Sequence, residues 1–413
     1  MKKTITVEMA AGGYLGEEKF FAVLKLPAQS YEIQDALQKL RITSNRDTNP
    51  WMEVCCCEIL PELTDVRLDS PSIQEMNFLA QRLAQLPDSE AIALRGVWKR
   101  LEKEGLLEEP VRAMDLINMT YGLDTVMIAS NVSNDYELGE FVLNGDLDDD
   151  LIRLSDKMVE LLDMEAVGRW NRINQAGEFV GNHYAVAGEY QLQHVYDGVN
   201  LPAMAVEKPF VFRLQVAKSP VDDSKENLST AEWISLPIDR DEADRIARNH
   251  NEGCIEDCYY YGFESAIPQI TEEHFGDMLS FVRLNRLAAG ISRMKLSEQV
   301  KLKAVLEHEK PRTLEAVQEV VDHLGEYQLD NRVGDADSYF KEYLLRHLDA
   351  RFDARWLDSL AVCTEGTKLI QRLGAAETDY GIVSARGGQL YALVPFEQEQ
   401  VQEGAMEMMM GGY

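Results

Sequence analysis

The sequence lacks the short motifs on which most enzyme chemistry depends. There is no Walker-type Gly-x-x-x-x-Gly-Lys-[Ser/Thr] loop, no Gly-x-Gly-x-x-Gly after a strand and no Gly-x-Ser-x-Gly elbow. The seven histidines occur singly, without the His-x-x-x-His spacing of a zinc site. We therefore expect a protein that is not an enzyme, with no catalytic residues and no cofactor. An enzyme of unrecognised type stays the least favoured alternative.

Metal-binding patterns are also incomplete. Asp146, Asp148 and Asp150 have the alternate spacing of a calcium loop. However, Leu151 stands where that loop needs Gly, and Lys157 stands where it needs its final Glu ligand. No metal site is predicted.

Long apolar runs and a disulfide framework are missing as well. No stretch of about 20 apolar residues could cross a bilayer, and residues 1–8 alternate like a strand instead of forming an apolar signal sequence. Three of the six cysteines are adjacent, at positions 55–57, which does not suggest a pattern of disulfides. We expect a cytoplasmic protein with no membrane partner.

Positive charge is scarce. The chain has 41 Lys and Arg against 71 Asp and Glu, a net charge of −30. Such a chain repels nucleic acid and anionic membranes, so its expected partner is a positively charged protein surface. Residues 1–206 carry 34 acidic and 18 basic side chains, so the two halves are similarly acidic. The alternative is that the charge only maintains solubility.

The chain shows internal repetition. Residues 5–10 and 212–217 are similar alternating strands, and a second strand ending in Leu-Pro follows each. Two helical patterns come next in each half, and a helix-to-strand element closes both, at 164–186 and 363–384. The predicted organisation is a first copy, a linker, a second copy and a flexible tail, at residues 1–190, 191–208, 209–396 and 397–413.

These patterns predict the α+β class. In each copy a small mixed subdomain of sheet and helix comes first, and mainly helical acidic subdomains follow. The expected whole is an elongated chain of several subdomains built from two tandem copies.

The densest acidic stretch lies between residues 135 and 165. Within it Leu151, Leu154, Met158, Leu161 and Leu162 have helical spacing, which predicts a helix with an apolar stripe and carboxylates facing water. Carboxylates about 5–6 Å apart on a helix face approach the spacing of DNA phosphates. The less specific reading is an ordinary solvated helix face.

Sixteen carboxylates are candidate phosphate mimics. Those of the first copy are Asp135, Glu137, Glu140, Asp146, Asp148, Asp149, Asp150, Asp156 and Glu160. Those of the second copy are Glu256 and Asp257, expected on its central strand, followed by Asp335, Asp337, Glu342, Asp349 and Asp353. Lys and Arg dilute the last five, so the second copy is expected to be the weaker mimic.

Several motifs resemble those of the ArdA antirestriction proteins. They are EWISLPID at 232–239, YYGFE at 260–264, RLNRL at 283–287, MEAVGR at 164–169 and GEFVGNHY at 177–184. ArdA proteins are encoded on mobile elements and inhibit type I restriction–modification enzymes. They are elongated acidic molecules, with three small subdomains per unit, that occupy the DNA-binding groove of the enzyme.

The resemblance implies competitive inhibition of a type I restriction–modification enzyme without catalysis, metal or nucleotide. Members of the family typically consist of one unit that dimerises, whereas this chain carries two. A covalent pair could replace the homodimer, or two chains could associate into a longer mimic. Two other functions stay open. One is inhibition of a different DNA-binding defence enzyme, such as a CRISPR effector. The other is a scaffolding or regulatory role in a conjugative element.

Overall fold

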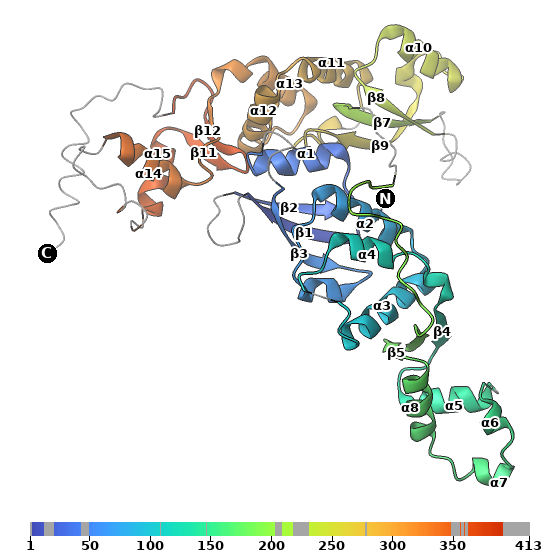
Figure 1. Cartoon of the computed structure of the whole chain (residues 1–413). Coiled ribbons are helices and arrows are strands. Elements are labelled where there is room, and N and C mark those ends of the chain that lie inside the picture. The colour runs from blue at the N-terminus through green and yellow to red at the C-terminus, as the bar shows by residue number, and fades with distance from the viewer. Residues whose placement is uncertain are drawn as a thin grey trace. The chain divides into compact units, whose positions relative to one another are not determined.

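The computed structural model divides the chain into two compact units, Met1–Glu207 (unit 1) and Lys208–Tyr413 (unit 2) (Figure 1). Both units combine helices with small antiparallel sheets, which confirms the α+β class. The structure describes residues 2–11, 20–42, 49–107, 109–145, 147–202, 209–217, 231–276, 279–347, 356, 359 and 362–390. The tail expected at 397–413 lies outside these residues. Within the described ranges, no helix has both the length and the apolar composition of a membrane span.

Unit 1 begins with a sheet and ends with another. Its elements are β1 (Ile5–Ala10), β2 (Phe21–Leu26), α1 (Ser30–Lys39), β3 (Trp51–Cys57), η1 (Pro61–Asp65), α2 (Ile73–Gln85), α3 (Asp88–Lys103), α4 (Ala113–Met119), η2 (Leu123–Thr125), β4 (Met127–Ser130), α5 (Asp135–Asn144), α6 (Asp149–Ile152), α7 (Asp156–Val159), α8 (Met164–Asn174), β5 (Gly177–Val180) and β6 (His183–Val186).

The first sheet of unit 1 is antiparallel in the order β2–β1–β3. Alternate side chains along β1 point into the core, so Ile5, Val7 and Met9 are buried while Glu8 is exposed. Val7 pairs with Leu24 on β2 and with Val54 on β3. Helices α1 and α2 contact this sheet at β2, and its buried side chains belong to one apolar core that also includes residues of α3 and α4.

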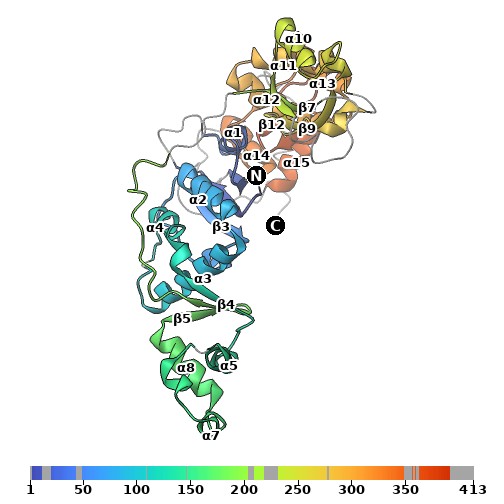
Figure 2. The same ribbon diagram turned by 90° about the vertical axis from the view of Figure 1, so that its right-hand side faces the viewer.

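The second sheet, in the order β4–β6–β5, packs against α3. A Cβ placed on Gly96 of α3 would lie only 2.5 Å from the Ala185 side chain, so the glycine lets helix and sheet approach closely. The chain leaves this sheet after β4, forms α5 to α8, and returns at β5. The four helices are therefore an insertion between two strands of one sheet, and both views show them grouped beyond β4 and β5 (Figures 1 and 2).

Unit 2 repeats this order with variations. Its elements are β7 (Phe212–Ala217), β8 (Glu232–Leu236), α10 (Arg240–Asn249), η3 (Ile255–Asp257), β9 (Tyr259–Ser265), η4 (Glu272–Phe275), α11 (Phe281–Ser292), α12 (Leu296–Glu309), α13 (Leu314–Asp322), η5 (Leu324–Glu326), β10 (Leu329–Asp330), α14 (Ala336–His347), α15 (Cys363–Arg372), β11 (Ala375–Thr378) and β12 (Gly381–Ser384).

The two units share their topology in detail. The sheet order β8–β7–β9 matches β2–β1–β3, and β10–β12–β11 matches β4–β6–β5. The central strand of the first sheet has one register shift in each unit, between Thr6 and Val7 in β1 and, two residues further along the strand, between Gln215 and Val216 in β7. The structures of the two units therefore match in more detail than their sequences do.

A side chain in each unit fixes the residue after the Leu-Pro pair. Asn77 accepts a hydrogen bond from the Ala28 amide at 2.6 Å and donates to the Ala28 carbonyl at 3.0 Å. Asn285 makes the same two bonds with Ile238, both at 2.9 Å. Each amide therefore satisfies a donor and an acceptor that the bend after β2 or β8 leaves outside the sheet.

The expected linker at 191–208 differs in its first part. Asn118, which is buried on α4, accepts hydrogen bonds from the amides of Val195 and Tyr196 at 3.0 and 2.8 Å. The Tyr196 ring is buried, and its hydroxyl donates to Glu75. Residues 191–202 therefore belong to unit 1, and the Tyr196 ring is part of its apolar core, with Leu192 and Leu201 packed against that core. Residues 203–208 lie outside the described ranges.

Replacing the bridging asparagines should destabilise the fold. Asn77→Ala or Asn285→Ala leaves two backbone groups without partners, and we expect each to lower the free energy of unfolding by about 1–3 kcal/mol. Urea denaturation followed by circular dichroism measures this change. Asn174→Ala, at an exposed position, is the matched control and should be near neutral. Equal stability of all three variants would contradict the assigned role.

Candidate partner-binding surface

The insertion of unit 1 forms a lobe with an excess of negative charge. Residues 133–174, called the acidic lobe below, contain 11 acidic and 4 basic side chains. Its two longer helices, α5 and α8, pack closely through glycines. A Cβ on Gly168 would lie 1.8 Å from the Asp135 carbonyl oxygen, and one on Gly139 would lie 2.0 Å from that of Met164. Glycine is required at both positions because backbone contacts backbone there.

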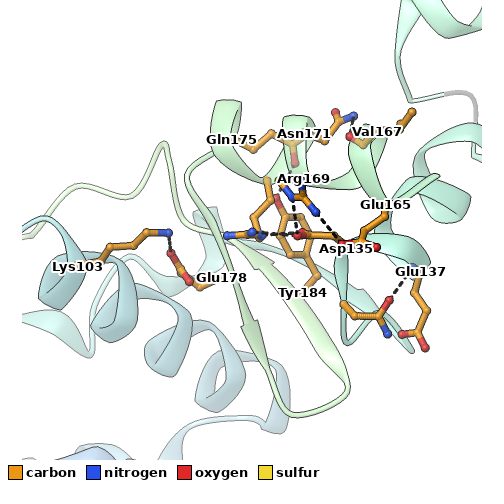
Figure 3. Close-up of polar contacts among 12 residues, drawn as sticks. Lys103, Asp135, Glu137, Glu165, Val167, Arg169, Asn171, Gln175, Glu178 and Tyr184 are labelled. Atoms are coloured by element: carbon orange, nitrogen blue, oxygen red, sulfur yellow. Dashed lines mark hydrogen bonds and ion pairs between the residues drawn. The ribbon is translucent and has the colours of Figure 1, made fainter. Parts of the chain in front are cut away.

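An ion pair joins the same two helices. Both carboxylate oxygens of Asp135, on α5, accept hydrogen bonds from Arg172, on α8, at 2.7 and 3.0 Å. The guanidinium of Arg169 lies 3.8 Å away (Figure 3). The bonds from Arg172 hold the pKa of Asp135 below its usual range. Asp135 was predicted to be a phosphate mimic, and in the structure its carboxylate pairs with arginine inside the lobe and joins α5 to α8.

The other two acidic candidates on α5 keep their charge. Glu137 accepts hydrogen bonds from the Ser133 amide at 2.7 Å and the Ser133 hydroxyl at 2.8 Å. These bonds, the backbone one above all, hold the pKa of Glu137 below its usual range. Glu140 is exposed and accepts a hydrogen bond only from the neutral Tyr136 hydroxyl at 3.2 Å. No cation pairs with either carboxylate among the described residues, so neither charge is offset inside the lobe.

Residues 146–163 do not form the single helix that was predicted. They form two helices of four residues each, α6 and α7. Asp148 ends the preceding loop by accepting hydrogen bonds from the amides of Asp150 and Leu151, as an N-cap does. Met158 and Leu161 are 56% and 85% exposed. The predicted buried stripe is therefore wrong, because local bonds from side chain to backbone compete with a continuous helix.

The acidic candidates of this segment differ in how far they are exposed. Asp150 has a side chain 91% exposed, with the exposed Arg153 3.6 Å away, and Glu160 is also exposed. Asp148 is half-buried because of its capping role. Asp146 and the side chains of Asp149 and Asp156 lie outside the described residues. Exposed carboxylates of the acidic lobe thus come from α5, from α6 and from the turn after α7.

In unit 2, Glu256 and Asp257 do not lie on a strand as predicted. They belong to η3, a short turn of helix that precedes β9, and β9 is an edge strand of its sheet. Asp257 accepts hydrogen bonds from the Cys254 amide and thiol, at 3.2 and 3.1 Å. The prediction failed because this carboxylate folds back on the preceding backbone and starts a turn before the tyrosines begin the strand. Both carboxylates are nevertheless exposed.

The remaining described candidates of unit 2 have partners on or near α14. Asp335 accepts hydrogen bonds from the Ser338 amide and hydroxyl. Asp337 pairs with Lys341 at 2.7 Å, and Glu342 lies 4.0 Å from Arg346. Asp349 and Asp353 lie outside the described residues. Residues 334–373, which match the acidic lobe in topology, contain 7 acidic and 6 basic side chains, so this second lobe is nearly neutral.

The even charge of the two halves conceals an uneven distribution inside unit 1. Residues 101–200 carry 20 acidic and 6 basic side chains, whereas residues 1–100 carry 14 and 12. Most of the negative charge of unit 1 therefore belongs to its second half, which includes the acidic lobe. A count in shorter windows would have found this signal in the sequence.

A groove lies beside α3 and α4. It has a volume of about 590 Å³, and apolar side chains such as Leu101, Leu107 and Met119 line much of it. Its Arg100 side chain donates to the Ala187 carbonyl, and Arg112 pairs with Asp115 at 2.8 Å. Across the described part of the chain, no three His, Cys, Asp or Glu side chains come together as metal ligands.

Comparison of the chain with protein-family models and with curated proteins finds no match.

The Asp135–Arg172 pair should make the stability of unit 1 sensitive to acid. The lowered pKa of Asp135 stabilises the fold above the unfolded-state pKa, near about 4, and this contribution is lost as the pH falls through the folded-state value. Asp135→Asn should lower the free energy of unfolding by about 1–3 kcal/mol at neutral pH. The difference from wild type should vanish in strong acid.

Urea unfolding at a series of pH values tests this expectation. Asp150→Asn is the matched control, because this carboxylate and the Arg153 beside it are both highly exposed, and the pH profile of the variant should follow that of wild type. Parallel profiles for wild type and Asp135→Asn would mean that the ion pair contributes nothing to the fold.

Proposed function

We propose that this protein is a cytoplasmic, non-catalytic inhibitor of a DNA-binding enzyme, and that its acidic lobe occupies the basic groove that normally holds DNA. The observation that carries the proposal is the set of exposed carboxylates on this lobe, where acidic side chains far outnumber basic ones. Glu140, Asp150 and Glu160 are exposed, and the lobe as a whole has 11 acidic but only 4 basic side chains. The target suggested by the resemblance to ArdA proteins is a type I restriction–modification enzyme.

The physical basis of the proposal is a shared electrostatic field. A groove built to bind DNA carries Lys and Arg at phosphate spacing, and a negatively charged protein surface can replace the phosphates there. The exposed carboxylates of the acidic lobe come from several short elements. They therefore act together through the electric field that they share, and they do not form a regular row like the phosphates of DNA. No single carboxylate should be essential.

Unit 1 is the unit we expect to make this contact. The corresponding lobe of unit 2 is nearly neutral, and its described candidates Asp337 and Glu342 lie near Lys341 and Arg346. A nearly neutral lobe gains little from a basic groove. We therefore assign target binding to the acidic lobe and a weaker contribution, if any, to α14 and α15.

Charge removal on the two lobes tests the proposal. The lobe variant is Glu137→Gln, Glu140→Gln, Asp150→Asn and Glu160→Gln, which removes four charges and keeps side-chain size. The matched control removes four charges from unit 2 by Glu256→Gln, Asp257→Asn, Asp335→Asn and Glu342→Gln. We expect the lobe variant to need at least about tenfold more protein for half-inhibition of DNA cleavage by a type I enzyme. The control should stay within about twofold of wild type.

Three results would count against the proposal, and a fourth would change only the target. Equal inhibition by the lobe variant and wild type would remove the acidic lobe from the mechanism. Inhibition that does not weaken as salt rises would remove electrostatics from it. Inhibition of a CRISPR effector, but not of the type I enzyme, would keep the mechanism and change the target. Failure of the wild-type protein to inhibit either enzyme would favour a scaffolding role instead.

A further inference from the structure

The first sheet of unit 2 has a tryptophan on the face opposite its apolar core. Leu214 and Val216 of the central strand β7 are buried in that core. Arg213 and Gln215 alternate with them and therefore point to the opposite face, which we call the outer face. Trp233 of β8 pairs with Gln215, so it lies on the outer face too, and it is 41% exposed.

The Trp233 ring extends across the sheet. Gln215 pairs with Trp233 on one side and with Gly262 of β9 on the other. A Cβ on Gly262 would lie only 3.0 Å from Cη2 of the Trp233 ring. The ring from one edge strand thus reaches over the central strand to the other edge strand, and glycine leaves the room that this position requires.

Trp233 already contacts a cation of its own unit. The guanidinium carbon of Arg213 lies 5.1 Å from the centroid of the Trp233 ring and 5.0 Å from that of Phe210. A guanidinium nitrogen lies 3.2 Å from a carboxylate oxygen of Glu264. The faces of aromatic rings attract cations, so one arginine is held here by two rings and a carboxylate.

Tyr259 continues this surface along β9. It pairs with Ala217, which follows Gln215 by two residues on β7, so it lies on the outer face as well. The Tyr259 side chain is 51% exposed, and its ring centroid lies 5.6 Å from that of Tyr261. We call the surface that carries Trp233 and Tyr259 the aromatic face of unit 2.

Unit 1 builds the same sheet without a ring across its central strand. Glu8, like Gln215, is the fourth residue of the central strand, and it pairs with Val23 and Glu53. Val23 therefore stands where Trp233 stands in unit 2. Because the sheet forms with valine at this position, the fold does not require the tryptophan, which points to a contact that unit 2 makes.

The surrounding charge identifies the kind of partner. Residues 231–276 carry 11 acidic and 3 basic side chains, whereas residues 20–65, the matching stretch of unit 1, carry 7 and 4. The three basic residues of 231–276 all belong to α10, so η3, β9 and η4 contain no Lys or Arg. Aromatic sheet faces can stack nucleobases, but this concentration of carboxylates repels the phosphates of a nucleic acid. A cationic partner is favoured instead.

We propose that the aromatic face of unit 2 binds a protein segment that presents an arginine side chain. The incoming guanidinium stacks on the accessible part of Trp233 beside Tyr259, as Arg213 stacks on the same ring from within the unit. A guanidinium suits this surface because it is planar and weakly hydrated, so it stacks on rings and still donates hydrogen bonds to carboxylates. Glu256 and Asp257, which are exposed and precede Tyr259 by three and two residues, supply the negative charge.

Titration with a short peptide tests this inference. The probe is a capped Arg-Gly-Arg-Gly-Arg peptide, and the same peptide with citrulline for arginine has a similar shape without the charge. Trp233→Val with Tyr259→Thr removes the aromatic face, and Val23 shows that the sheet accommodates valine. The matched control, Trp170→Val with Tyr136→Thr, removes a tryptophan and a tyrosine that are 58% and 52% exposed on the acidic lobe. Calorimetry at physiological ionic strength gives the dissociation constants, and circular dichroism verifies the fold.

Wild type should bind the arginine peptide at least about tenfold more tightly than the citrulline peptide, because the rings attract the charge. Loss of the aromatic face should weaken binding of the arginine peptide at least about tenfold, and the control variant should stay within about twofold of wild type. The comparison of the two peptides uses wild type alone, so it does not depend on the folding of a variant.

Four results would overturn the inference. Wild type might bind neither peptide, or it might bind both equally. The variant without the aromatic face might bind the arginine peptide as wild type does, which would assign the peptide to carboxylates elsewhere. A single-stranded oligonucleotide might bind wild type and lose affinity in that variant, which would make the aromatic face a site for nucleobases.

This test is independent of the proposed function, because the exchange leaves the acidic lobe intact. Binding of the arginine peptide at the aromatic face without inhibition of a DNA-binding enzyme would refute only the proposed function. Inhibition by a wild-type protein that does not bind the peptide would refute only the inference about the aromatic face.

Discussion

The close approach of two helix backbones is the constraint on which each inserted lobe depends. Gly168 lies against the Asp135 carbonyl in unit 1, and Gly366 lies against the Ala336 carbonyl in unit 2. A side chain at either position would push the helices apart, because the atoms it would meet belong to the backbone and cannot rotate away. This contact fixes the position of the helix pair on a sheet of only three strands. It leaves the outer faces of the helices free to carry whatever residues their function requires.

The two units have used this freedom differently. In unit 1 the pair is held by Asp135 and Arg172, whereas the equivalent residues of unit 2, Ala336 and Ile370, are buried in an apolar cluster. These apolar contacts need no charge, and the lobe of unit 2 to which they belong, residues 334–373, is nearly neutral. In unit 1, where an ion pair joins the two helices, the surface of the lobe is acidic, and Trp170 and Ile173 of α8 are exposed. The same arrangement of strands and helices thus occurs in both units, but only the lobe of unit 1 has the strongly acidic surface.

The sequence predicted the architecture better than the site. Alternation along β1 and β7 and helical spacing around Leu79 and Leu284 gave the α+β class, because these patterns depend on local periodicity alone. The acidic positions were harder to interpret. Asp135 is neutralised by an arginine 37 residues away, and no local pattern shows that pairing. The segment around Asp148 has helical spacing of leucines, but its carboxylate caps the backbone and divides the segment into two short helices. Trp170 and Ile173 are exposed on α8, and this exposure stands out only when Gly168 and Gly366 are used to align α8 with α15. Lys368 and Gln371 then occupy the corresponding positions.

The central claim is that the acidic lobe and DNA compete for one groove, and equilibrium competition measures this directly. The protein is titrated into a type I methyltransferase bound to labelled duplex, at several duplex concentrations and at low and moderate salt. Competition predicts complete release of the duplex. It also predicts a half-release concentration that rises in proportion to the free duplex, and an affinity that falls steeply with salt. A complex that holds enzyme, duplex and this protein together, or no release at any salt from a folded protein, would contradict the claim.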